Sequence, residues 1–280
     1  DLIYSVLSEA GKIAAEVFAP LNRAGDVNPA KLVDRGVRTS PGFKEAYDAF
    51  AAGGWLGLTA DPDFGGAGLP HTIACAVYEM FNSANASLTL GPILALGAVD
   101  AISHHASEEL KRLYLPKIVS GEWLATMNLT ESQAGSDLSD LKTRAAPQAD
   151  GSYRLFGSKI FISWGDHDLT DNIIHLVLAR TPDAPEGSRG ISLFLAPKVL
   201  VNPDGSLGAA NDLRCTRLEE KMGLHGSPTC AMSYGEKDGA VGYMIGAENK
   251  GLAAMFTMMN AARLFVGLQG VGVAERAYQA

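Results

Sequence analysis

The chain has 280 residues, of which 47% are apolar, and this is enough to bury a core in one large domain or in two or three smaller ones. Its 23 basic and 31 acidic residues give a formal net charge of -8. Lysine and arginine do not gather in a stripe that would neutralise phosphate groups. We therefore expect neither nucleic acid nor a membrane surface as a partner.

The cysteines and the chain ends indicate the compartment. Cys75, Cys215 and Cys230 lie far apart, in neither a disulfide framework nor CxxC spacing, so we expect buried thiols, a reducing cytoplasm and no zinc site. The start of the sequence has no basic segment followed by an apolar one, and no apolar run approaches the ~18 residues of a membrane span. Both ends break off within helical patterns, which predicts that the chain is a piece of a longer protein.

The first part of the chain is predicted to be helical. From Leu2 to Phe18 apolar residues recur at three- and four-residue spacing, and Pro20 ends the pattern. Ser107 is a suitable N-cap for the segment "EELKRLYLPK". The other expected helices span residues 43–50, with Pro41 in the first turn and Gly53-Gly54 at the close, 71–83 and 92–104. "TADPDFGGAGLP" is a predicted loop, and no strand is expected before about residue 120.

From Leu124 the period of the pattern becomes that of strands. The expected strands are "LATMNLT", "YRLFG", "KIFIS", "NIIHLVLAR", "GISLFLAP", "LRCTRLEE" and "TCAMSYG". Strands at this density, without helices between them, favour an antiparallel sandwich or barrel. After Gly246 the helical period returns for one long helix or two joined ones. The predicted fold is α+β and multidomain: an N-terminal α-helical domain (1–123), a middle antiparallel β-barrel or sandwich domain (124–243) and the start of a C-terminal helical bundle (244–280).

Two motifs are set aside at this point. "GVGVAE" at residues 270–275 lacks the third glycine of a dinucleotide-binding fingerprint and lies within a helical run, so helix packing through small residues is the favoured interpretation. His104 and His105 are adjacent on a predicted helix, where neighbouring side chains point in different directions, and no carboxylate partner accompanies them. We therefore expect no metal site.

The stretch "NLTESQAGSD" places small and polar residues directly after an apolar strand. In such a strand Met127 and Leu129 share one face, and Thr130 lies on the other. Gly135 and Ser136 leave main-chain N–H groups accessible and add a hydroxyl donor. The patch would suit an anionic, planar and partly apolar ligand such as a flavin dinucleotide. Taken alone, a strand followed by a solvated turn remains the favoured interpretation.

A second passage, "GSKIFISWG" at residues 157–165, makes the flavin site the favoured interpretation of both. The two passages together resemble the "TEP-x-AGSD" and "G-x-K-x-[WF]-I-[TS]" signatures of the acyl-CoA dehydrogenase family. "ADPDFGGAGL", "HHASEELKRLYLPKIVSGEW", "EEKMGLHGSPT" and the helix from "MFTMMNAARLF" onward are similar to further family motifs, in the family's order. These segments are most similar in sequence to the longer subgroup of the family, which includes methylthiopropionyl-CoA dehydrogenases.

The resemblance implies a flavin site and a substrate site. FAD would lie between the β domain and the C-terminal helices, and the bound substrate would be an acyl-CoA. The residues matched to cofactor-binding positions are Met127, Leu129, Thr130, Gly135, Ser136, Phe161, Ile162 and Ser163. Those matched to substrate positions are Ser136, Asn260 and Arg263, with Leu88, Leu90, Leu94 and Leu96 either lining the acyl channel or packing in the core.

Several positions depart from the family pattern. Ser132-Gln133 replaces the usual Pro-Gly, and Asn260 stands where an aspartate is common. Most family members carry the catalytic glutamate far downstream, which here means beyond Ala280. A few carry it one residue before the matched arginine, where this chain has Ala262. The sequence therefore supplies much of one face of a flavin site without the catalytic base.

The reaction implied by the resemblance is α,β-dehydrogenation of an acyl-CoA thioester, in which a carboxylate removes the α-proton and the β-hydrogen leaves as hydride. An electron-transfer flavoprotein would be the acceptor, and the complete protein would be a homodimer or homotetramer. An acyl-CoA oxidase, a nitroalkane-oxidase-like flavoenzyme and a non-enzymatic, DNA-associated relative of the family remain alternatives.

Overall fold

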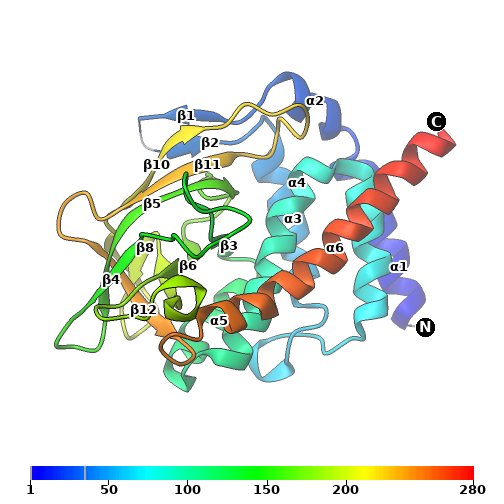
Figure 1. Cartoon of the computed structure of the whole chain (residues 1–280). Coiled ribbons are helices and arrows are strands. Elements are labelled where there is room, and N and C mark those ends of the chain that lie inside the picture. The colour runs from blue at the N-terminus through cyan, green and yellow to red at the C-terminus, as the bar shows by residue number, and fades with distance from the viewer. Residues whose placement is uncertain (1, 35) are drawn as a thin grey trace.

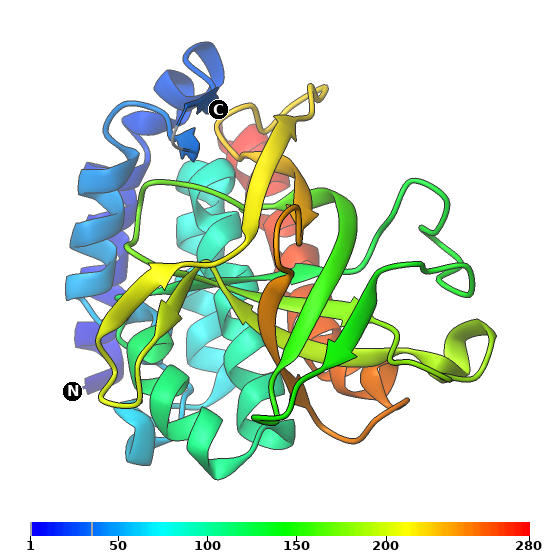
Figure 2. The ribbon, with the colours of Figure 1, turned by 90° about the vertical axis from the view of Figure 1, so that its left-hand side faces the viewer.

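The computed structural model describes residues 2–34 and 36–280 and arranges them as a helical layer beside a β domain. Figure 1 shows the sheet on one side and the helices on the other, with α6 crossing the helical layer diagonally. Figure 2, turned by 90°, shows the first helices of the chain to the left of the twisted strands, with α4 behind the strands. This confirms the predicted order of N-terminal helices, middle β domain and C-terminal helix.

The first helical stretch ends before Pro20, as predicted, but a helix that was not predicted follows directly after it. Helix α1 (Leu2–Lys12) continues into a π-helical segment (Ile13–Phe18), and after Pro20 the chain turns into α2 (Leu21–Val27). Proline lacks the N–H group that a helix interior needs, but Pro20 occupies the N-cap of α2, where the missing donor costs nothing. The proline therefore divides two helices and does not close the helical region.

The prediction that no strand precedes residue 120 is wrong. Strands β1 (Lys31–Val33) and β2 (Gly36–Arg38) form an antiparallel pair. All three residues of β1 are exposed, so no alternation of buried and exposed positions marks it in the sequence. The pair packs against the edge strand β10 of the middle sheet.

The next helices follow the predicted segments with two corrections. Helix α3 (Phe43–Ala52) begins after Gly42, so Pro41 lies in the preceding turn. The two segments predicted at 71–83 and 92–104 form one element, α4 (His71–His105), with Pro92 inside it. The chain bends at Asn85, whose φ/ψ of -157°/87° is not helical. Helix α5 (Glu108–Val119) is capped as predicted, because Ser107 Oγ accepts a hydrogen bond from Leu110 N.

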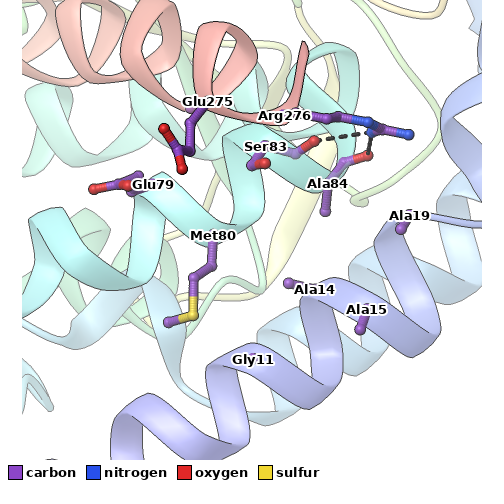
Figure 3. A pocket seen from close by; sticks show the side chains of 11 residues that line it. Gly11, Ala14, Ala15, Ala19, Glu79, Met80, Ser83, Ala84, Glu275 and Arg276 are labelled. Carbon is purple, nitrogen blue, oxygen red and sulfur yellow. Dashed lines mark hydrogen bonds between the residues drawn. The ribbon is translucent and has the colours of Figure 1, made fainter. Parts of the chain in front are cut away.

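The bend in α4 frees carbonyl groups, and α6 (Gly251–Gln279) satisfies them. Arg276 Nη1 donates to Ser83 O at 2.9 Å and to Ala84 O at 2.8 Å (Figure 3). Gln269 Nε2 donates to the carbonyl of Ala86 at 3.1 Å. Since an unpaired buried carbonyl is costly, these contacts stabilise the bend and hold α6 along α4.

The middle domain is an eight-stranded sheet in which seven strands follow the order β10-β11-β5-β12-β7-β6-β3, while β4 pairs with β5 beside this path. The expectation of a purely antiparallel domain is wrong, because β3 pairs with β6 in parallel. The segments "YRLFG" and "KIFIS" form one long strand. The bounds are β3 (Leu124–Asn128), β5 (Tyr153–Ser163), β6 (Ile173–Ala179), β7 (Ser192–Pro197), β10 (Leu213–Leu218) and β11 (Thr229–Tyr234).

Four strands of this domain were not predicted. They are β4 (Arg144–Pro147), β8 (Val199–Val201), β9 (Leu207–Ala210) and β12 (Ala240–Ile245). β8 and β9 form a separate two-stranded sheet. Small residues and short lengths deprive β4 and β9 of a readable period.

The helices and the inner face of the sheet share one hydrophobic core, and a second core lies within the β domain. Helices α4 and α6 are both long and apolar enough to cross a membrane by length and composition, contrary to the prediction that no run is. In α4, 83% of the most apolar window is buried inside the protein, so this helix is explained as a core element. In α6 the corresponding share is 33%, and the helix lies against α4. "GVGVAE" lies within α6, where a Cβ on Gly272 would come within 2.9 Å of the Glu79 carbonyl oxygen. This confirms a packing role for that glycine.

Candidate flavin-binding site

The ends of β3 and β5 lie side by side and bring the two sequence motifs together. Ile160 N donates to Thr130 O at 2.9 Å, just beyond the end of β3. Thr126 Oγ1 donates to Ser163 O at 2.7 Å. A Cβ on Gly135 would lie 3.7 Å from Thr130 Cγ2, so the loop after β3 folds back over the strand end. The cofactor-binding positions matched in β3, its loop and β5 therefore form one local surface.

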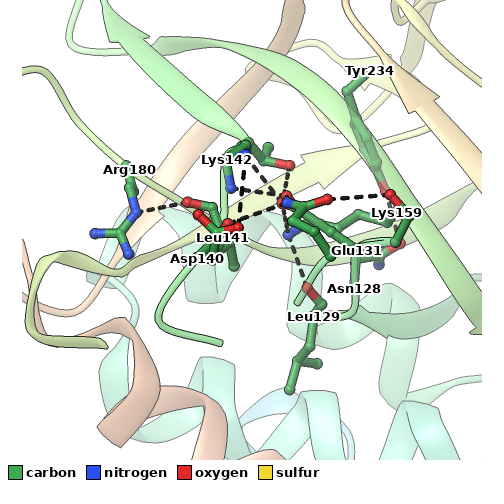
Figure 4. Close-up of polar contacts among 12 residues, drawn as sticks. Asn128, Leu129, Glu131, Asp140, Leu141, Lys142, Lys159, Arg180 and Tyr234 are labelled. Atoms are coloured by element: carbon green, nitrogen blue, oxygen red, sulfur yellow. Dashed lines mark hydrogen bonds and ion pairs between the residues drawn. The ribbon is translucent and has the colours of Figure 1, made fainter. Parts of the chain in front are cut away.

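A buried ion pair holds this surface from beneath. Lys159 Nζ lies 2.8 Å from Glu131 Oε1 and donates to Leu129 O at 2.9 Å, with the two side chains 0% and 5% exposed (Figure 4). The Glu131 carboxylate also accepts hydrogen bonds from Thr143 Oγ1, from the main-chain N–H groups of Thr143 and Lys142, and from a glutamine side chain. Thr130 lies between two residues that Lys159 contacts, so its position is fixed on both sides.

Both members of the pair are charged at neutral pH. Burial raises the pKa of Glu131, but the Lys159 ammonium and the hydrogen bonds from Lys159, Thr143 and Lys142 outweigh it and lower the pKa to about 2. Burial lowers the pKa of Lys159 to about 8, against the opposing effect of Glu131. Such a pair orients its neighbours through several hydrogen bonds at once. Removing either partner leaves the other as an uncompensated buried charge.

The acid dependence of stability should reveal Glu131. Its pKa in the folded protein lies below the ordinary value of 4.5, so its contribution is present above pH 4.5 and lost as the pH falls towards 2. Between pH 5 and pH 3.5 this group alone should remove about 1 kcal/mol from the free energy of unfolding. Urea unfolding at these two pH values should show that Glu131→Gln loses less stability than the wild type on acidification. An equal loss in both proteins would contradict the assignment.

A second group, Arg180, secures the outside of the same loop. Its guanidinium donates to Leu141 O and Ser139 O, both at 2.7 Å, and also to the carbonyls of Pro185 and Gly187. The segment between Glu131 and Leu141 is therefore anchored at both ends, while Gly135 and Ser136 at its tip stay exposed. Sequence reasoning assigned no role to Glu131, Lys159 or Arg180. The one available signal was a lysine at an inward-facing position of a strand.

Phe161 is unusual in its exposure to solvent and in its backbone conformation. The residue is 60% exposed and its φ is 59°, a backbone conformation that bulky residues rarely adopt. Trp164, three residues on, also has a positive φ of 54° but is buried. Backbone strain of this kind concentrates at functional sites, and here it turns an aromatic ring outwards beside Thr130.

The other matched positions in this region differ in what they can offer. Ile162 is 2% exposed and packs in the core of the β domain, so only its main chain is available to a ligand. Met127 and Leu129 are half-buried against the main core. Within residues 2–34 and 36–280, the hydroxyl groups of Thr130, Ser136 and Ser163 have no hydrogen-bond partner. The surface thus combines an exposed ring, apolar flanks and unused hydroxyl donors.

Asn260 and Arg263 lie on the exposed face of α6. Arg263 Nη1 donates to Asn260 Oδ1 at 2.7 Å, and its guanidinium lies 5.3 Å from the centre of the Phe256 ring. An exposed arginine with a hydrogen-bonded amide beside it is a suitable donor to a phosphate or carbonyl group. The structure brings these two residues together with each other, and no contact joins them to the β3–β5 surface among the described interactions.

The four leucines matched to the acyl channel are core residues in this chain. Leu88, Leu94 and Leu96 are buried, and Leu90 packs against them. A separate cavity of about 440 Å³ lies between the N-terminal helices, α4 and the end of α6 (Figure 3). Small residues of the π-helical segment, Met80, Glu275 and Arg276 line it, and none of the four leucines does.

His104 and His105 have separate hydrogen-bond partners. His104 Nδ1 contacts the Asp100 carbonyl, whereas His105 Nε2 contacts Thr257 Oγ1, so the two rings point apart as predicted. Across residues 2–34 and 36–280 there is no group of three or more histidine, cysteine, aspartate and glutamate side chains suited to a metal ion.

Comparison with known proteins identifies the family. The N-terminal domain of acyl-CoA dehydrogenases matches residues 12–122, and the middle domain of the same family matches residues 126–236. The chain therefore belongs to the acyl-CoA dehydrogenase family.

Relatives of the chain carry more specific names. A 3-methylmercaptopropionyl-CoA dehydrogenase of Ruegeria pomeroyi is 50% identical over 275 residues, which are 98% of this chain and 46% of the relative. A butyryl-CoA dehydrogenase of Syntrophomonas wolfei is 42% identical over 289 residues, covering 100% of this chain and 47% of the relative. The chain thus spans about half the length of the curated relatives it matches.

Solved structures show the same fold. The butyryl-CoA dehydrogenase of Megasphaera elsdenii matches with a TM-score of 0.79 and 24% identity, over 99% of this chain and 67% of the other. An acyl-CoA dehydrogenase complexed with FAD from Bacillus anthracis matches with a TM-score of 0.78 and 23% identity, over 99% and 42%. A structure described as the electron transferring flavoprotein of Acidaminococcus fermentans matches with a TM-score of 0.80 and 25% identity, over 99% and 66%.

FAD is the cofactor of this family, and the β3–β5 surface suits a flavin ring system. A flavin is planar and apolar across its faces, with hydrogen-bonding groups along one edge. The exposed Phe161 ring offers an aromatic face, and Thr130 and Ser163 offer free hydroxyl donors close to it. The exposed loop tip at Gly135 and Ser136 adds donors without bulky side chains, as a phosphate requires.

Proposed function

We propose that this chain forms the N-terminal and middle parts of a flavin-dependent dehydrogenase that introduces an α,β double bond into an acyl-CoA thioester. The observation that carries the proposal is the β3–β5 surface, where a strained, outward-facing Phe161 adjoins the free hydroxyls of Thr130 and Ser163. The names of the two relatives described above support the reaction class. The three-part division at residues 123/124 and 243/244 belongs to the same proposal.

Each matched residue has a role in this proposal. Met127, Leu129 and Phe161 flank the flavin ring, and Thr130 and Ser163 donate to its polar edge, while Ile162 contributes its main chain. Gly135 and Ser136 hold the pyrophosphate or the CoA pantetheine. Asn260 and Arg263 hold CoA through the phosphate or a carbonyl group. The catalytic carboxylate is proposed to lie beyond the 280 residues, since Ala262 occupies the alternative position.

The chemistry divides between the cofactor and the chain. FAD, when bound, supplies a two-electron acceptor for the hydrogen that leaves the β-carbon as hydride. The chain itself binds and orients the reactants: Glu131 and Lys159 fix Thr130, and Arg180 fixes the loop that carries Ser136. Replacing Glu131, Lys159 or Arg180 would leave the hydroxyl donors of Thr130 and Ser136 in place but less well oriented. Since binding depends on their orientation, the affinity for the cofactor would fall.

Removing the two free hydroxyls should weaken FAD retention. In the full-length protein, Thr130→Val and Ser136→Ala each delete one donor and keep the side chain close in size. We expect the Kd for FAD to rise about tenfold in each variant, which corresponds to the loss of one hydrogen bond of about 1.4 kcal/mol. The measurement is the flavin absorbance retained after gel filtration. Thr216→Val is the control, because β10 and β3 are the two ends of the strand order and the Thr216 hydroxyl donates to Ala231 O within the sheet. If Thr130→Val and Ser136→Ala retain FAD as well as this control and the wild type do, the assignment is wrong.

The reaction class can be tested on the full-length protein with a panel of acyl-CoA thioesters. Anaerobic addition of a substrate should bleach the visible flavin absorbance, and an electron-transfer flavoprotein should restore it faster than air does. Faster recovery in air would instead indicate an acyl-CoA oxidase. If no thioester bleaches the flavin, the dehydrogenase proposal fails. A cytoplasmic location, a role in fatty acid metabolism and assembly as a homodimer or homotetramer complete the proposal.

A further inference from the structure

Two of the three cysteines meet inside the β domain. Cys215 lies on β10 and Cys230 on the neighbouring antiparallel strand β11. Cys215 pairs with Met232, and Cys230 lies two residues from Met232 on the same strand, so all three side chains share one face. Both cysteines belong to the core of the β domain, and the Cys215 thiol donates a hydrogen bond to Arg217 O at 3.3 Å. The third cysteine, Cys75, lies in α4 without a second thiol nearby.

The two thiols differ in access. Cys215 lines a cavity of about 600 Å³, together with Met232, Lys198, Asp166 and the β1–β2 hairpin. Cys230 is fully buried behind it, with 0% of its surface exposed. A small reagent that enters the cavity therefore reaches Cys215 first. Cys230 is then the nearest group able to react with a modified Cys215.

The electrostatic surroundings also favour reaction at Cys215 before Cys230. The neighbouring Cys230 thiol lowers the pKa of Cys215, whereas the Cys215 thiol and burial raise the pKa of Cys230. Lys198, which pairs with Asp166 across a distance of 2.5 Å, also favours the Cys215 thiolate, while Asp166 opposes it. Since the thiolate is the reactive form of cysteine, Cys215 is the better nucleophile of the two.

We infer that Cys215 and Cys230 form a peroxide-reactive thiol pair at the wall of this cavity, a modification site independent of the proposed flavin chemistry. Cys215 attacks hydrogen peroxide and becomes a sulfenic acid, and one water molecule leaves. The Cys230 thiol then attacks the Cys215 sulfur, and a second water leaves as the disulfide forms. The two thiols together give up two electrons and two protons, and the peroxide is reduced to two water molecules.

The backbone must move for the bond to form. Diagonal positions on neighbouring antiparallel strands are about 7–8 Å apart at Cα, whereas a disulfide spans about 5.5–6 Å. β10 has an irregular register between Cys215 and Arg217, which is where the strand must yield. A disulfide made with such strain is easily reduced, so a dithiol should restore both cysteines.

The test is peptide mapping after exposure of the 280-residue chain to hydrogen peroxide and alkylation of the remaining thiols. Cleavage after arginine and lysine places Cys215 in residues 215–217 and Cys230 in residues 222–237. We expect these two peptides to appear joined, with the loss of two hydrogen atoms, and to separate after treatment with dithiothreitol. Cys75, oxidised at the same peroxide concentration, should form no internal link.

Two variants separate the roles of the thiols. In Cys230→Ser, Cys215 should stop at the sulfenic acid, which dimedone traps. In Cys215→Ser, Cys230 should remain a free thiol under the same treatment, because it is buried. The inference is overturned if Cys75 is oxidised while both partners stay reduced, or if Cys230 reacts equally well without Cys215.

Discussion

Lys159→Met should destabilise the chain by about 3 kcal/mol or more. Methionine keeps the length of the side chain but removes the ammonium that neutralises Glu131, which is 5% exposed. Breaking one partner of a buried pair costs about 3–5 kcal/mol, because the other charge stays buried. The lower end applies here, since Thr143 and the Lys142 N–H continue to donate to the carboxylate. Urea unfolding followed by circular dichroism measures the loss.

Two controls define the meaning of that result. Lys142→Met makes the same exchange in an exposed pair with Asp140, where both side chains are more than half exposed, and should change stability by less than about 0.5 kcal/mol. The double variant Lys159→Met/Glu131→Gln removes the stranded charge and should recover part of the loss. If Lys159→Met costs no more than Lys142→Met, the pair does not support the site. In the full-length protein the single variant should also retain FAD poorly, because Leu129 loses the contact that fixes Thr130.

Local signals predicted the elements whose residues carry their own pattern. Ser107 and the glutamates after it place the start of α5 correctly, and the alternating segment from Leu124 places β3. The segments 71–83 and 92–104 were separated because nothing in the sequence shows that Asn85 bends a helix without ending it. The hairpin at β1 and β2 was missed because its exposed residues have no apolar period.

The sequence motifs identify surface residues of the candidate site but not the residues that lie beneath them. Thr130, Phe161 and Ser163 stand in recognisable motifs, and the structure brings them together. Lys159 and Glu131 are 28 residues apart, and their pairing depends on the folding of β5 beside the end of β3. Contacts of this kind arise from tertiary structure, so local pattern and propensity cannot reveal them. The parallel pairing of β3 with β6 escaped prediction for the same reason.

Gly251→Ala should be the most damaging exchange of a single hydrogen for a methyl group at the junction of the β domain and α6. A Cβ on Gly251 would lie 2.2 Å from the Ser192 carbonyl carbon and 2.4 Å from Leu193 N. The added methyl group would therefore clash with backbone atoms, which cannot move aside as a flexible side chain can. The Gly251 N–H donates to Ile191 O at 2.8 Å, a bond that any displacement of the helix would break. We expect a loss of about 3 kcal/mol in the free energy of unfolding.

Gly267→Ala supplies a control within the same helix. No atom lies within 4 Å of a Cβ at Gly267, so alanine there should stabilise the 280-residue chain by about 0.5–1 kcal/mol through its higher helix propensity. The opposite signs of the two exchanges, measured by urea unfolding, separate close packing at the domain junction from the general effect of glycine in a helix. Equal effects would mean that α6 does not begin against β7. Since the proposed flavin site needs both the β domain and α6, Gly251→Ala should also release FAD from the full-length protein.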